Sequence, residues 1–304
     1  MKNSKNIHFK TTPKSFLARK TPYFIKKVFR MIKINRINKI HGGNIKECKA
    51  NLFWYNRTQN FGDWIGPYLY EKITGVKPVY KVPKNEHIES VTSSVGSIVN
   101  LTQRNSILWG SGIMDKQTFF VKPHKTCAVR GPLTRKRFLE MGYECPEIYG
   151  DPALLMPNYF NPFVEKTHTV GIIPHNVDLE EVTATYQNIE GIKVISVLDS
   201  VENVIREILS CKMILSSSLH GVILGHAYKI PTAWVHFSLK LPGDDVKFFD
   251  YFLSIKMNEI EGPIDLKSSK ALSVEKTEEI INKFPQPNSY PLIDEDLLLN
   301  ACPF

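Results

Sequence analysis

Short apolar runs alternate with segments of helical apolar spacing along most of the chain. Such runs, bounded by turn residues, predict strands, and apolar positions recurring every three or four residues predict helices. Up to residue 150, the pattern predicts helices over 63–73 and 132–141 and strands over 52–55, 79–82, 97–99, 107–109 and 127–129. The second helix has Pro132 in its first turn and Gly142 after its last, the usual residues at helix ends.

The alternation resumes after a stretch over 151–166 that is rich in Pro and Asn, which we interpret as a domain boundary. Beyond it, the pattern predicts strands over 169–173, 193–197, 213–215 and 232–235 and helices over 178–187, 201–209 and 219–228. This predicts an α/β protein with two Rossmann-like parallel-sheet domains facing a central cleft. Because parallel sheets bind ligands at the carboxyl ends of their strands, we expect the active site in that cleft.

We divide the chain into a basic N-terminal arm (1–46), a first domain (47–160) and a second domain (161–304). Of the 39 Lys and Arg residues, 13 lie in the arm, which has no acidic residue, leaving 26 basic against 30 acidic residues elsewhere. Over 23–37, helical spacing places apolar side chains on one side and basic ones mainly on the other. This is typical of a cationic helix in an anionic membrane interface; the alternative is a helix that packs on the folded core.

Other classes of protein are disfavoured by the composition. No run approaches the ~18 apolar residues of a transmembrane helix, and the N-terminus lacks the apolar centre of a signal peptide. The five cysteines are widely spaced without a CxxC pair, which predicts reduced thiols in a cytoplasmic protein. No His, Cys or acidic cluster has metal-ligand spacing, so we expect no metal. Because basic residues gather only in the arm, no nucleic-acid partner is predicted.

Polar residues cluster where the predicted strands of the first domain end. In Asn60-Phe61-Gly62-Asp63, the Asp either caps the next helix or lies in the cleft, where a carboxylate can bind a hydroxyl or accept its proton. Gly110-Ser111-Gly112 follows another strand and indicates either close approach to a ligand or a tight turn. Arg130 lies between a strand and a helix N-terminus, a position suited to a carboxylate or phosphate; an ion pair with a structural carboxylate is the alternative.

The second domain has the strongest local motif. An apolar strand leads into Ser216-Ser217-Ser218-Leu219-His220-Gly221 and then a helix, so hydroxyls, free amides and an imidazole meet at one helix N-terminus. This predicts a phosphate site with a proton donor. His175, at the end of the strand over 169–173, is a further candidate for binding phosphate or donating a proton.

Together, these segments resemble the polysaccharide pyruvyltransferase family from about Asn51 to Val235. The matching pieces, in order, are NFGDW, WGSGI, RGPLTRKRFLEMG, YGDPALL, GIIPHNVD and SSSLHGVILGHAYKIPTAWV. The resemblance implies an arrangement like that of GT-B glycosyltransferases, with an acceptor-side first domain and a donor-phosphate-side second domain. It also implies phosphoenolpyruvate as donor, no cofactor, and a cyclic ketal formed on a hexose of a surface polysaccharide or its lipid-linked precursor. Residues 1–40 would then bind the inner face of the cell membrane.

The resemblance and the residues together suggest a set of roles. We assign His220 as the acid that protonates the donor's methylene carbon, and Asp63 or Asp151 as acceptor of the hydroxyl protons. The expected donor ligands are Arg130, which the family implicates directly, and Ser216, Ser217, Ser218, Leu219 and His175. The expected acceptor ligands are Asn60, Gly62, Gly110 and Ser111.

One departure from the family concerns the residue before Leu219-His220. Many members have Arg there, whereas this chain has Ser218, so Arg130, Lys212 or the helix N-terminus must compensate for the missing charge. Two alternative functions remain. A GT-B glycosyltransferase would use the same phosphate site, but the second domain has no obvious acidic signature for a base or ribose. A membrane-docked binding protein without activity is supported only by Ser218.

Overall fold

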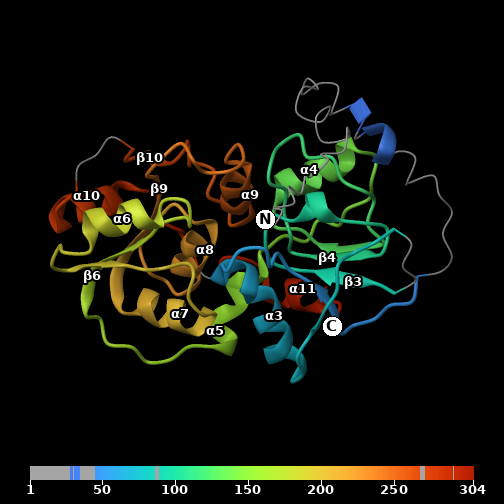
Figure 1. Cartoon of the computed structure of the whole chain (residues 1–304), viewed down its shortest axis with the longest axis horizontal. Coiled ribbons are helices and arrows are strands. Elements are labelled where there is room, and N and C mark those ends of the chain that lie inside the picture. Colours follow the sequence, from blue (N-terminus) through green and yellow to red (C-terminus); the bar gives the residue numbers. More distant parts are fainter. Residues whose placement is uncertain (1–27, 30, 35–44, 86–88, 268–270, 290) are drawn as a thin grey trace, which may run out of the picture. The chain divides into compact units, whose positions relative to one another are not determined.

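The computed structural model describes residues 28–29, 31–34, 45–85, 89–267, 271–289 and 291–304 (Figure 1). It has two compact units, Met1–His41 and Gly42–Phe304. In the first unit the described residues are helical; Phe29 and Ile32 are exposed, whereas Ile34 is buried. The rest of the predicted arm helix lies outside the described residues. Within the described part of the chain, no helix has the length and apolar character needed to cross a membrane.

The second unit contains two five-stranded sheets with parallel pairing throughout, which confirms the predicted α/β class with two parallel-sheet domains. The first sheet has the order β2-β1-β3-β4-β5. Its strands are β1 (Asn51–Phe53), β2 (Val79–Tyr80), β3 (Val91–Ser93), β4 (Ser106–Trp109) and β5 (Lys125–Ala128). The helices of this region are α3 (Phe61–Thr74), the 3₁₀ helix η1 (Val99–Leu101), α4 (Pro132–Glu140), the 3₁₀ helix η2 (Pro152–Leu155) and α5 (Met156–Tyr159).

One predicted strand of the first sheet is wrong. Residues 97–99 form a bend that enters η1, and the strand that pairs with β1 and β4 is β3. Two of the three β3 residues, Thr92 and Ser93, are polar and buried, so the segment lacks the apolar pattern of a central strand. Tertiary pairing has therefore overridden local preference here.

The second sheet has the order β10-β9-β8-β6-β7. Its strands are β6 (His168–Ile173), β7 (Ile192–Val194), β8 (Cys211–Ser216), β9 (Thr232–His236) and β10 (Ile264–Asp265). Its helices are α6 (Leu179–Tyr186), α7 (Val201–Leu209), α8 (Leu219–Ala227), α9 (Val246–Ser254) and α10 (Val274–Lys283), and α11 (Glu295–Asn300) follows. In Figure 1, helices lie over both faces of this sheet.

The core of the second sheet comes from its continuous apolar runs. Ile172 and Leu215, on paired strands, are completely buried, as expected for a parallel sheet with both faces covered. From β9, Trp234 stacks on Phe248 of α9 with ring centroids 4.3 Å apart. This stacking brings α9, which the sequence pattern did not predict, against the carboxyl end of the sheet.

Several contacts connect elements of the two sheets. The Phe61 amide, at the start of α3, donates to the Val197 carbonyl after β7 (2.8 Å). The C-terminal tail returns to the first sheet, where the Trp109 indole donates to the Leu298 carbonyl (2.8 Å) and the Phe304 ring packs against Trp109. The domain division at 160/161 and the GT-B-like cleft stay predictions.

Candidate functional site

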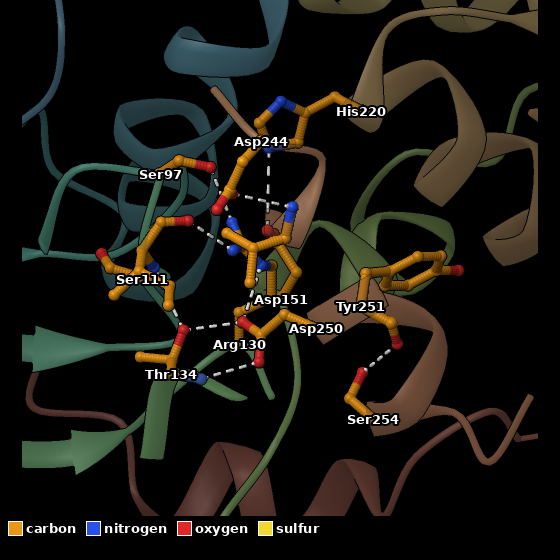
Figure 2. Close-up of polar contacts among 12 residues, drawn as sticks. Ser97, Ser111, Arg130, Thr134, Asp151, His220, Asp244, Asp250, Tyr251 and Ser254 are labelled. Carbon is orange, nitrogen blue, oxygen red and sulfur yellow. Dashed lines mark hydrogen bonds and ion pairs between the residues drawn. The ribbon is translucent and has the colours of Figure 1, made fainter. Parts of the chain in front are cut away.

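His220 and Asp151 meet although they belong to different parts of the chain. His220 lies in the first turn of α8, and Asp151 precedes η2, where its Oδ1 accepts the Ala153 amide (3.0 Å). The His220 Nε2 and Asp151 Oδ2 are 3.7 Å apart and, among the described residues, neither atom has a hydrogen-bond partner (Figure 2). Since the Asp151 side chain is fully buried, its carboxylate can orient the imidazole and stabilise its protonated form.

Asp63 joins this pair from the first turn of α3. The helix is capped by Asn60, whose side chain accepts the Gly62 amide (3.0 Å), so the Asp63 carboxylate is not used as the cap. Burial raises its pKa from 3.8 to about 6, against the opposing charges of His220 and Lys247. A carboxyl with a pKa this near neutrality can exchange a proton with a hydroxyl.

Gly62 allows His220 to lie close to α3. A Cβ built on Gly62 would be 2.2 Å from the His220 Nδ1, closer than any real contact. The position therefore requires glycine for its lack of a side chain rather than for its backbone angles. Asp63, His220 and Asp151, the three predicted catalytic residues, thus converge from α3, α8 and the segment before η2.

Arg130 is completely buried and bonded to protein groups. Its Nε donates to Asp250 Oδ2 of α9 (3.1 Å), Nη1 to Ser97 Oγ (2.7 Å) and Nη2 to the Ile113 carbonyl (2.8 Å) (Figure 2). Asp250 also accepts the amide and hydroxyl of Thr134 in the first turn of α4. These contacts fit the alternative interpretation of a structural ion pair, and the role of Arg130 as a donor ligand stays a prediction. The distant partner Asp250 gave no signal in the sequence around Arg130.

The predicted phosphate turn is held by its own hydroxyls. Ser216 Oγ donates to the Ile173 carbonyl (3.0 Å) and accepts the Ser218 amide (3.0 Å). Ser217 Oγ accepts the His175 amide (2.9 Å). Ser218 is the N-cap of α8, but its side chain makes no capping bond, so this helix begins without a side-chain acceptor. Of the four predicted donor ligands in this turn, Leu219 belongs to the apolar core.

The other predicted ligands differ in their exposure to solvent. His175 is half-buried, and burial followed by the charge of Lys247 lowers its pKa to about 4. Ser111 is fully buried and donates to the Ser94 carbonyl (2.7 Å). Gly110 has φ +82°, and a Cβ there would be 2.2 Å from Pro152 Cδ. Gly110 and Ser111 thus form a tight turn against protein, next to Asp151.

Lys247 is a residue of this region that the sequence interpretation missed. It lies in the first turn of α9, is only 6% exposed, and affects the pKa values of both Asp63 and His175. Burial, followed by the charge of Arg130, lowers its own pKa to about 8. The available signal was a pair of charged residues, Lys247 and Asp250, in a mainly apolar helix, VKFFDYFLS.

A pocket of about 830 Å³ lies beside α3, between the segment after β1 and the start of α7. Trp64, the neighbour of Asp63, is 43% exposed there, and its ring centroid lies 5.7 Å from that of Trp54. The buried Trp54 indole N–H has no hydrogen-bond partner among the described residues. The remaining lining is largely polar and includes Asn56, Thr58, Gln59, Tyr68, Glu71, Lys77, Asp199, Ser200, Glu202 and Asn203.

Metal ligands do not gather in the described residues: no three His, Cys, Asp or Glu side chains there are placed to hold an ion. The five cysteines are free thiols.

Comparison with known proteins adds three findings. The family model for polysaccharide pyruvyl transferases matches residues 11–236. The uncharacterized protein L143 of Acanthamoeba polyphaga mimivirus is 30% identical over 208 residues, which cover 66% of this chain and 72% of that protein. The crystal structure of a functional uncharacterized protein, KP1_0663 from Klebsiella pneumoniae subsp. pneumoniae NTUH-K2044, aligns with a TM-score of 0.43 and 12% identity over 79% of this chain and 97% of that one.

Proposed function

Because the chain belongs to the polysaccharide pyruvyl transferase family, as its motifs predicted, we propose that it transfers the pyruvyl group of phosphoenolpyruvate to two hydroxyls of a hexose. The product is a cyclic ketal on a surface polysaccharide or its lipid-linked precursor, and inorganic phosphate is released. The observation that supports this proposal best is the convergence of His220, Asp151 and Asp63 in one largely buried cluster. The family does not favour the nucleotide-sugar alternative.

The proposed chemistry needs an acid and a base, and the cluster offers both. Protonated His220, held by Asp151, donates its proton to the methylene carbon of the enol, which becomes a methyl group. The central carbon becomes electrophilic, and a sugar hydroxyl adds to it while Asp63 accepts the hydroxyl proton. We assign the base to Asp63 rather than Asp151 because Asp151 is fully buried beside the imidazole.

The ketal is completed when phosphate leaves and the second hydroxyl bonds to the same carbon. The proton of this hydroxyl returns to the cluster or leaves with phosphate, so donor and diol together give ketal and phosphate, with no oxidant or reductant. Positioning of the donor and acid–base catalysis each contribute on the order of a hundredfold or more to the rate.

We assign the pocket at Trp54 and Trp64 to the sugar acceptor. A hexose has an apolar C–H face and a rim of hydroxyls; indole rings cover the first, and amides and carboxylates such as Asn56 and Glu71 bind the second. Trp64 directly follows Asp63 on α3, but Asp63 does not itself line the pocket, so the reacting hydroxyls of a bound sugar must extend around the start of this helix to reach the proposed base. The arm, through residues 1–40, would hold the enzyme at the inner face of the cell membrane, where lipid-linked acceptors are presented.

The test is phosphate release from phosphoenolpyruvate, measured with galactose-, glucose- and mannose-containing lipid-linked acceptors and followed by mass spectrometry. We expect one acceptor to gain the mass of pyruvate less one water, and His220→Ala to lose nearly all turnover while remaining folded. No transfer across the panel, together with binding of a nucleotide sugar, would replace the proposal by the glycosyltransferase alternative. Near-normal activity of His220→Ala would remove the acid role of His220.

A further inference from the structure

The proposed donor brings a carboxylate and a phosphate into the site. The positive groups expected to bind them are missing, exposed elsewhere or already paired with a protein carboxylate. The serine turn (216–218) before α8 carries no charged side chain. Arg130 is fully buried and paired with Asp250. Lys212 is exposed on β8. Some other positive group must therefore balance the donor's charge.

Lys247 is a buried cation with no carboxylate within ion-pair distance among the described residues. Its side chain makes no hydrogen bond or ion pair within 4.0 Å to any residue that the structure describes, and its Nζ lies 5.4 Å from the centroid of the Phe248 ring. Leaving an ammonium group buried and unpaired costs several kcal/mol, on the order of the desolvation of one ion. Such a cost is tolerated where a bound anion supplies the missing partner.

The surroundings of Lys247 point to the catalytic cluster. Asp245, which directly precedes α9, lies 3.3 Å from His236 at the end of β9, and β9 pairs with β8, the strand that leads into the serine turn. The start of α9 therefore lies at the same edge of the sheet as the serine turn, where Ser217 accepts the His175 amide. The charge of Lys247 also influences Asp63 on α3 and His175 after β6. Two other nearby carboxylates have different partners or positions: Asp245 pairs with His236 (3.3 Å), and Asp115 lies in the loop after β4.

The N-terminus of α8 lies at the end of the same turn. The helix has nine residues, and the Ser218 side chain makes no capping bond, so its first-turn amides are available to a ligand. Uncapped helix N-termini bind phosphate through these amides and the helix dipole. A cation close to such a terminus completes a phosphate site.

We propose that Lys247 and the uncapped N-terminus of α8 form an anion subsite that binds the phosphate of the donor, with Lys247 supplying the positive charge that the serine turn lacks. The subsite itself follows from the unpaired buried cation; that its anion is phosphoenolpyruvate rests on the proposed function. The same groups would retain the released phosphate, so inorganic phosphate is expected to compete with the donor.

The experiment measures calorimetric binding of inorganic phosphate and of phosphoenolpyruvate to the full chain, in the wild type and in Lys247→Met, Lys247→Arg and Lys136→Met. The last is a matched control, since Lys136 is exposed on α4. We expect Lys247→Met to weaken both affinities by roughly thirtyfold or more, Lys247→Arg to retain part of them, and Lys136→Met to match the wild type.

Melting temperature separates ligand binding from a structural role. Because Lys247→Met removes an unpaired buried charge, we expect it to melt at or above the wild-type temperature without anions and to lose the stabilisation that phosphate gives the wild type. Wild-type phosphate affinity in Lys247→Met, or a lower melting temperature without ligand, would overturn the proposal. If phosphate binding depends on Lys247 but no acceptor is pyruvylated, the subsite stands and the proposed function fails.

Discussion

The ionised Asp63 carboxylate is expected to destabilise the fold and to act as the base of the reaction. Asp63→Asn tests both effects. Burial raises the pKa of Asp63 from 3.8 to about 6, a shift that corresponds to about 3 kcal/mol between its two protonation states. The protonated form is favoured by folding. The contribution of the protonated carboxyl to the free energy of unfolding is therefore fully present below pH 3.8 and is lost as the pH rises to about 6.

Asn resembles the protonated carboxyl in size and stays uncharged. At pH 8 we expect Asp63→Asn to be more stable than the wild type by up to about 3 kcal/mol, or roughly 5–10 °C in melting temperature. Near pH 3.5 the difference should vanish. Turnover should fall by about a hundredfold or more because the proposed base is lost.

The assay is urea or thermal unfolding at pH 3.5, 5, 6.5 and 8, with Glu261→Gln as an exposed control that should change little at any pH. Equal stability of Asp63→Asn and the wild type at every pH would show that burial does not destabilise the ionised Asp63 carboxylate. Wild-type turnover in Asp63→Asn would remove its role as base and leave the stability argument intact.

Three further perturbations address the neighbouring residues. Gly62→Ala should displace the His220 ring and reduce turnover at least about tenfold, although Ala favours the helix by about 1 kcal/mol; unchanged kcat would show that the ring adjusts freely. Asp250→Asn should destabilise the fold by about 3–5 kcal/mol in chemical denaturation because it leaves Arg130 buried without its counter-charge; a loss below about 1 kcal/mol would contradict this. Trp64→Ala should raise KM for the sugar acceptor at least about tenfold and leave KM for phosphoenolpyruvate unchanged, whereas equal changes in both would argue against an acceptor pocket.

Much of the candidate site was predictable because its residues lie in local motifs. The polar turn between an apolar strand and a helix identified His220, and Asn60-Phe61-Gly62-Asp63 identified the start of α3. Such motifs can be recognised in a sequence because strand ends and helix starts depend mainly on nearby residues. Asp151 was also predicted, but only the structure brings its carboxylate to 3.7 Å from His220.

Sequence alone determined the two series of parallel strands and helices, because apolar runs buried on both faces of a sheet repeat visibly along the chain. It could not identify β3, whose Thr92 and Ser93 are buried by pairing and not by their own hydrophobicity. Only the tertiary structure decided that Arg130 pairs with Asp250, 120 residues away, and that Lys247 is buried without a hydrogen-bond or ion-pair partner among the described residues. The physical reason is that charges have no periodic pattern of their own: the groups that meet them depend on how distant elements pack.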